Sequence, residues 1–67
     1  METNKKVKDA LRKANVTMEE LGSFRNVSKQ AISQMLKAEL PAEKQDEMCR
    51  QIIEIASDRL RALKEGA

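Results

Sequence analysis

The sequence predicts an all-α fold, a small bundle of four helices in a single domain that covers residues 1–67. Apolar residues recur at intervals of three and four along most of the chain, which is the period of helices packed on one side. No stretch alternates with a period of two, as a half-buried strand would. The 67 residues include two Gly and one Pro, so few positions break a helix.

The first two helices are expected over residues 4–14 and 18–24. The first is strongly basic and has one apolar stripe, made of Val7, Ala10, Leu11 and Ala14. The second begins after Thr17, whose hydroxyl is spaced to accept from the backbone of Glu20, while the Glu20 carboxylate can reach back to Thr17. This pairing is a capping box, and it fixes the start of the second helix.

A tight turn joins the second helix to a third, expected over residues 29–37 with Ser28 as its N-cap. Gly22 is small at a point where two steeply crossing helices need to approach closely. Asn26 stands at the turn, and Asn is the non-glycine residue that best tolerates a left-handed backbone. The buried stripe of the third helix is expected to be Ala31, Ile32, Met35 and Leu36. This arrangement predicts a helix-turn-helix.

A long C-terminal helix is expected over residues 41–64, with Pro41 at its first position. The alternative is a pair of helices broken near Ser57-Asp58, which would make five in all. The apolar stripe of this segment is broader than one small domain needs to cover. A homodimer would cover the surplus, and its interface is expected at Ile52, Ile53, Ile55, Leu60 and Leu63.

The charge of the chain is uneven, although the net charge is only +2. Residues 1–37 contain eight Lys and Arg against four Asp and Glu, a balance of +4, while residues 38–67 contain five against seven, a balance of −2. A basic first half indicates a polyanionic partner better than the total does. A solvated surface of mixed charge is the alternative interpretation.

Enzymatic and metal chemistry find little support in the composition. The chain has no His, one Cys and no Gly-rich phosphate loop, so we expect no catalytic residue, no metal site and no cofactor. Cys49 lies on an apolar stripe and is expected in the core. No signal peptide and no apolar run of about 20 residues is visible, which predicts a cytoplasmic protein without a membrane span.

Residues 16–38, "VTMEELGSFRNVSKQAISQMLKA", resemble the DNA-binding unit of the Cro/C1-type (XRE-like, lambda-repressor-like) repressors of phages and bacteria. The matching residues are Thr17, Glu19, Glu20, Leu21, Val27, Ser28, Ile32 and Ser33. Gly22 and Asn26 replace the usual Ala and Gly of that family. Met18 stands where the family usually has a Gln that contacts a phosphate, and Arg25 stands where an apolar residue is usual.

The resemblance implies that the third helix enters the major groove of duplex DNA. The residues it places against base edges are Ser28, Lys29, Gln30, Ser33 and Gln34. Gln can pair with adenine through two hydrogen bonds, and Lys can donate to guanine. The residues expected at phosphates are Thr17, Arg25, Lys37, Lys5 and Lys6, where contacts set affinity and salt dependence rather than sequence choice.

The function expected from this resemblance is a repressor that binds a double-stranded operator and occludes a promoter. We expect a homodimer on a pseudo-palindromic site and no small-molecule ligand, since the chain has no room for a ligand domain. One alternative is a protein-binding modulator or antirepressor that pairs its helical fold with a larger regulator. In a third interpretation Gln30 and Gln34 are simply solvated helix surface.

Overall fold

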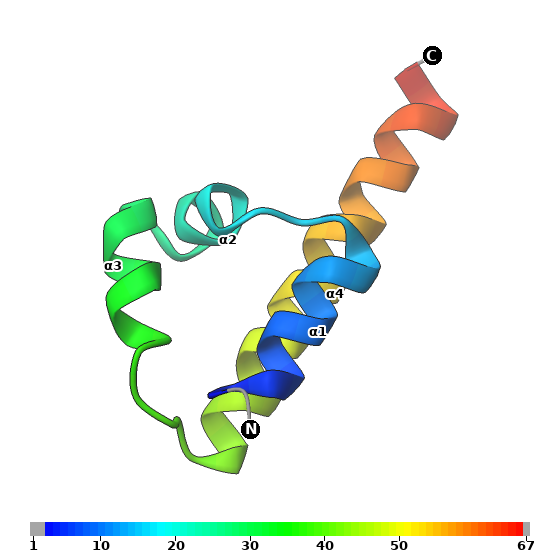
Figure 1. Cartoon of the computed structure of the whole chain (residues 1–67). Helices are drawn as coiled ribbons and strands as arrows, with labels where there is room; N and C mark the ends of the chain where they lie inside the picture. The colour runs from blue at the N-terminus through cyan, green and yellow to red at the C-terminus, as the bar shows by residue number, and fades with distance from the viewer. Residues whose placement is uncertain (1–2, 67) are drawn as a thin grey trace.

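The computed structural model describes residues 3–66, which form four α-helices. They are α1 (Lys5–Ala14), α2 (Met18–Arg25), α3 (Lys29–Met35) and α4 (Ala42–Gly66). In Figure 1, α1 lies along α4, and α2 and α3 lie to one side of this pair. The predicted all-α bundle with a helix-turn-helix and a long C-terminal helix is confirmed.

The C-terminal helix α4 is unbroken over 25 residues, so the alternative with a break near Ser57-Asp58 is wrong. At 1.5 Å per residue it is about 37 Å long, close to the 39 Å longest dimension of the molecule. Residues 60–66 are all exposed and continue past the rest of the bundle (Figure 1). Among residues 3–66, no helix has the length and apolar character that crossing a membrane requires.

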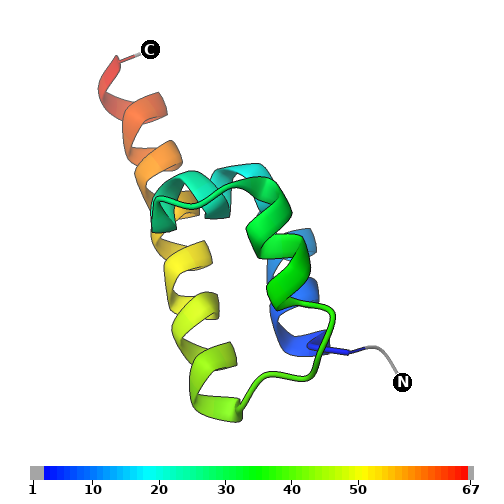
Figure 2. The same ribbon diagram turned by 90° about the vertical axis from the view of Figure 1, so that its left-hand side faces the viewer.

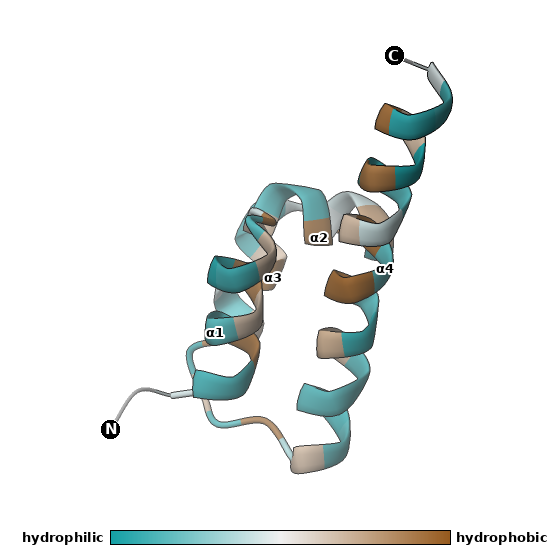
Figure 3. Cartoon of the chain, turned by 90° about the vertical axis from the view of Figure 1, so that its right-hand side faces the viewer, coloured by the Kyte–Doolittle hydropathy of each residue, from teal (hydrophilic) through white to brown (hydrophobic). Residues whose placement is uncertain are grey.

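One hydrophobic core joins all four helices. Its buried residues are Val7, Leu11, Val16, Leu21, Ile32, Leu36, Met48 and Ile52. Figure 3 shows the apolar bands of α4 turned toward the other helices. Burying one such side chain contributes about 1.5–3 kcal/mol, so eight of them drive the packing of a chain this short.

The start of α2 has the capping box that the sequence predicts. The hydroxyl of Thr17 accepts a hydrogen bond from the backbone N–H of Glu20 at 3.1 Å. The backbone N–H of Thr17 donates to Oε1 of Glu20 at 3.0 Å. These bonds satisfy groups that a helix start leaves without intrahelical partners, which fixes where α2 begins.

The turn between α2 and α3 is tight because Gly22 has no Cβ atom, which lets the backbone of Val27 and Ser28 approach α2 closely. A Cβ atom on Gly22 would lie 2.7 Å from the carbonyl oxygen of Val27. Asn26 adopts the predicted left-handed conformation, with φ at 61°. The N–H of Val27 then donates to the Gly22 carbonyl at 2.8 Å, and the Ser28 hydroxyl accepts from the N–H of Ala31 at 3.1 Å. The turn and the start of α3 are therefore held by neighbouring residues.

The connection from α3 to α4 is held by Asn4, a role that the sequence did not suggest. Asn4 is fully buried and left-handed, with φ at 56°. Its side-chain amide donates to the carbonyls of Leu36 at 3.1 Å and Ala38 at 2.9 Å. Its side-chain oxygen accepts from the N–H of Leu40 at 2.7 Å. Figure 2 shows the start of α1 beside this connection.

Glu39 and Gln45 complete the polar cluster around Asn4. The backbone N–H of Asn4 donates to Oε1 of Glu39 at 2.9 Å, and the Gln45 amide donates to Oε2 of Glu39 at 2.8 Å. These two hydrogen bonds, that from Asn4 foremost, lower the pKa of Glu39 below its ordinary value. The end of α3 is thereby fixed relative to α1 and the start of α4.

Candidate nucleic-acid interface

The exposed side of α3 is polar and carries no acid. Together with Ser28 before the helix and Lys37 after it, this side has six exposed residues: Ser28, Lys29, Gln30, Ser33, Gln34 and Lys37. The nearest acids along the chain are Glu20 and Glu39. The structure thus brings all five predicted base-contacting residues to one surface.

The opposite side of α3 anchors it in the core. Ile32 is fully buried and Leu36 nearly so, while Ala31 and Met35 are half-buried. Because apolar residues hold one side of the helix, the polar side chains of the other side face solvent along the whole length of α3. Its two ends are held by the turn at Asn26 and by the contacts of Asn4.

This surface has the chemistry that recognition of base pairs requires. Gln30 and Gln34 each offer a donor and an acceptor on one planar amide, the combination that matches adenine in the major groove. Lys29 offers a charged donor suited to guanine. The Ser28 hydroxyl accepts from the backbone of Ala31, and its O–H remains able to donate to a phosphate or base.

Two of the five predicted phosphate contacts already have partners on α4. Lys6 forms an ion pair with Asp46, which raises the pKa of Lys6 and lowers that of Asp46. Arg25 is half-buried and donates to Oε1 of Gln51 at 2.7 Å. Both cations help to hold α4 against α1 and α2, a role that sequence spacing could not reveal because each partner lies more than 20 residues away along the chain.

The other three predicted phosphate contacts are exposed. Lys5 lies in the first turn of α1, and Lys37 follows α3. Thr17 precedes α2, and its hydroxyl belongs to the capping box. Exposure leaves Lys5 and Lys37 accessible to an anion, and Lys37 extends the polar surface of α3.

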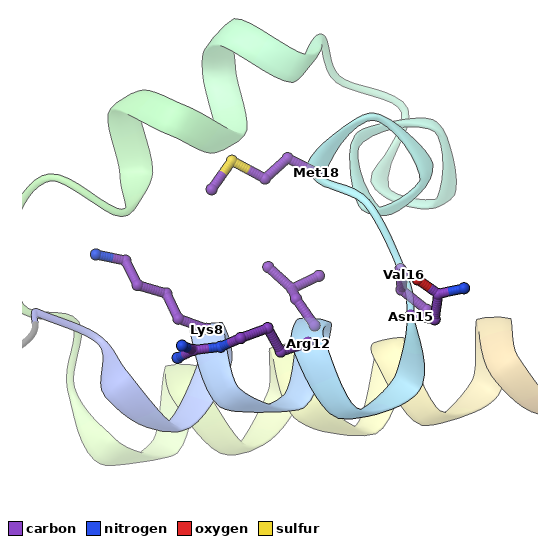
Figure 4. Close-up of a pocket in the computed structure, with 6 residues that line it drawn as sticks. Lys8, Arg12, Asn15, Val16 and Met18 are labelled. Atoms are coloured by element: carbon purple, nitrogen blue, oxygen red, sulfur yellow. The ribbon is translucent and has the colours of Figure 1, made fainter.

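A hollow between α1 and α2 adds cations that the sequence interpretation missed. Its volume is about 410 Å³, and its lining residues are Lys8, Leu11, Arg12, Asn15, Val16 and Met18. Figure 4 shows Lys8 rising from α1 and Met18 extending from α2 into the same opening, with α3 opposite. The sequence feature that could have indicated these cations is the spacing of Lys8 and Arg12, which are four residues apart and therefore lie on one side of α1.

The predicted dimer interface needs correction. Ile52 is fully buried and belongs to the core, so it is inaccessible to a partner. Ile55 is half-buried and packs against the same core. The three other predicted residues are more than three-fifths exposed, namely Ile53, Leu60 and Leu63. The sequence pattern overestimated the interface because Ile52 and Ile55 serve the core of the chain itself, whereas Ile53, Leu60 and Leu63 face solvent.

Cys49 is partly buried beside α1, as its place on the stripe predicted. Its thiol lies 3.6 Å from the carbonyl oxygen of Lys6, and burial raises its pKa. A raised pKa keeps the sulfur in the unreactive thiol form at neutral pH.

Within residues 3–66, no group of three or more metal-ligating side chains gathers. Comparisons with known protein families, with curated proteins and with solved structures each find no match to this chain.

Proposed function

We propose that this chain is a sequence-specific regulator that binds double-stranded DNA with α3 in the major groove and represses transcription by occupying a promoter. The observation that carries the proposal is the exposed, acid-free surface of α3, where two Gln, two Ser and two Lys side chains lie opposite a buried apolar side. A helix inserts into the major groove with its polar side against base edges. The resemblance of residues 16–38 to Cro/C1-type repressors supports the same function.

Two copies of the chain bind two half-sites in this proposal. A pseudo-palindromic operator places its half-sites about one helical turn, ~34 Å, apart. The interface now expected is the exposed apolar edge of α4 at Ile53, Leu60 and Leu63, each of them more than 60% exposed. Leu60→Glu then gives a folded monomer in sedimentation, because residue 60 lies beyond the core. The dimer acts on DNA in the cytoplasm.

A protein-binding modulator is the second candidate, and the same edge of α4 favours it. Leu60 and Leu63 form an apolar surface on a helix end that projects from the bundle. A larger regulator could cover that surface in place of a second copy. This candidate requires no DNA contact by α3, so a DNA-binding measurement separates the two.

Selection of preferred sites from random duplex DNA, followed by titration of the selected duplex, tests the first proposal. We expect binding that prefers the selected sequence and weakens steeply with salt. Gln30→Ala relaxes the preference at one base position and costs roughly 1–3 kcal/mol of discrimination there.

Lys37→Ala is the matched comparison on the same surface. It weakens binding to all sequences about equally, since a phosphate contact carries no base information. Absence of binding at low salt would reject the DNA-binding function. An unchanged preference in Gln30→Ala would reject the orientation of α3.

A further inference from the structure

Three cations follow one side of α1. Lys5, Lys8 and Arg12 are spaced by three and four residues, which places them in a row on a helix surface. Lys8 and Arg12 are also part of the lining of the hollow between α1 and α2. We call these three residues the α1 cation row.

The surroundings of the α1 cation row favour an anion. Within the described part of the chain, the hollow is lined by six residues, and none of these six is an Asp or Glu. Arg12 donates to Asp9 at 2.7 Å, but the Arg12 side chain is 65% exposed, and exposed pairs of this kind contribute little stability. A guanidinium has five N–H donors, so an exposed Arg12 can donate to a phosphate beside its existing contacts. Glu39, whose pKa the charge of Lys8 helps to lower, already accepts hydrogen bonds from Asn4 and Gln45.

The hollow also has an apolar part beside its cations. Leu11 and Val16 are buried residues of its lining, and Met18 extends into it (Figure 4). A DNA backbone presents charged phosphates alternating with largely apolar sugar carbons. Cations beside an apolar side chain such as Met18 suit such a ligand better than a free inorganic ion, which offers nothing for Met18 to contact.

We propose that the α1 cation row binds the phosphate backbone of the same duplex whose bases α3 contacts, with the Lys8 ammonium and the Arg12 guanidinium at adjacent phosphates. The inference rests on the proposed DNA-binding function. Figure 4 shows α3 opposite α1 across the hollow, so a duplex seated on α3 has one strand available to this row. The row adds cations on the same helix as Lys6, and it does not depend on Arg25, which is half-buried and donates to Gln51 on α4.

The expected effect of these contacts is on affinity and register rather than on sequence choice. The Met18 side chain has no hydrogen-bond donor at the start of α2, so a charged side chain on α1 can supply the contact that positions the strand there. Two phosphate contacts on α1 would fix how far the N-terminal end of α3 enters the groove, because α1 and α3 share one core.

The test is the salt dependence of binding to the selected duplex, measured for single variants of α1. Each lost phosphate contact lowers the slope of log K against log salt by about 0.9. We expect this change for Lys8→Gln and for Arg12→Gln, with the same base preference as the unmodified chain. Lys8→Arg keeps the charge and should restore the slope.

Lys13→Gln is the matched control, since it removes one charge from α1 at an exposed position outside the hollow. Its slope should equal that of the unmodified chain. Equal slopes in Lys8→Gln, Arg12→Gln and Lys13→Gln would overturn the inference while leaving DNA binding intact. If the unmodified chain binds no duplex, the proposed function and this inference fall together. Circular dichroism confirms that each variant is folded.

Discussion

The two connections that flank α3 are held in different ways. The turn from α2 to α3 is fixed by residues within ten positions of one another, from Gly22 to Ala31. The connection from α3 to α4 is fixed by Asn4, which is 32 to 36 residues away from the groups it contacts. The orientation of the polar surface of α3 therefore depends on local contacts in the α2–α3 turn and on the long-range hydrogen bonds of Asn4.

Neighbouring residues are thus enough to fix the start of α3 but not to fix the connection that follows it. A capped start is set by a few side chains that compete for the same backbone groups. After α3 the backbone N–H of Lys37 still donates to the Gln34 carbonyl at 3.2 Å, but three further backbone groups, at Leu36, Ala38 and Leu40, are satisfied by the distant Asn4. Substitutions at the two connections should separate these contributions.

The largest effect is expected for Asn4→Ala. It removes the Asn4 partner of the buried Leu36 carbonyl and of the partly buried groups of Ala38 and Leu40, and a buried group left without a partner costs roughly 1–3 kcal/mol. We expect a loss of about 3 kcal/mol or more in the free energy of unfolding by urea.

Asn15→Ala is the control for the backbone conformation of Asn4. Asn15 is also left-handed, with φ at 55°, but it is exposed. Alanine at either position has the same conformational strain, so the difference between the two variants isolates the hydrogen bonds. Equal losses would mean that strain alone explains the effect.

Gly22→Ala should have the next largest effect, at the other connection. The added Cβ meets the carbonyl oxygens of Val27 at 2.7 Å and Ser28 at 3.2 Å, both of which are backbone atoms that must shift. Overpacking costs about 1–3 kcal/mol, and alanine recovers part of that as a better helix former. We expect a net loss of about 1–2 kcal/mol in thermal unfolding and, under the proposed function, weaker binding of DNA.

Ser23→Ala provides the comparison for Gly22→Ala, because Ser23 is the exposed next residue of α2. It should leave both stability and affinity nearly unchanged. A Gly22→Ala chain that keeps full stability would show that the turn can relax, and the proposed close approach would then have no energetic importance.

Thr17→Ala should cost about 1 kcal/mol, the usual value for a lost helix N-cap. The variant removes the acceptor of the Glu20 N–H and leaves the Glu20 side chain without one of its two Thr17 partners. Thr17→Ser keeps the oxygen and should restore most of the stability. If both variants unfold at the temperature of the unmodified chain, the capping box adds nothing to the tertiary packing of α2.

The smallest effect is expected from pH at Glu39. Its pKa is lowered in the folded chain from an ordinary value of 4.5, so the folded state binds fewer protons than the unfolded state. Its contribution to stability is present above pH 4.5 and is lost as the pH falls through the folded pKa. The melting temperature should fall less between pH 7 and pH 3 in Glu39→Gln than in the unmodified chain.

Glu43→Gln, an exposed acid in the first turn of α4, is the control for the pH experiment. It should lose as much stability as the unmodified chain over the same pH range. A Glu39→Gln chain with the same acid response as Glu43→Gln would remove the carboxylate of Glu39 from the account of the α3–α4 connection.

Local chemistry explains which parts of the fold were predictable. The capping box at Thr17, the left-handed Asn26 and the N-cap at Ser28 each depend on neighbours in the sequence, and all three are confirmed. Helical periodicity also placed the polar side of α3 correctly, since Ile32 and Leu36 had to face the core.

The parts that were not predictable depend on which helices meet. Asn4 looked like an ordinary polar residue before a basic helix, and its three contacts appear only once α1 lies beside the end of α3. The partners of Lys6 and Arg25 on α4 were hidden for the same reason. Ile52 was assigned to a dimer because a periodic stripe does not show where the core of one chain ends.

The buried Asn4 also sets an order of folding events. The contacts of the α2–α3 unit close short loops, while those of Asn4 close loops of 32 to 36 residues and carry a higher entropic cost. The long closures are therefore expected late, after the transition state, so that substitutions at residue 4 speed unfolding more than they slow folding. The lifetime of a correctly oriented α3 would then depend on the N-terminal end of the chain, which lies 32 to 36 residues away from the groups that it holds.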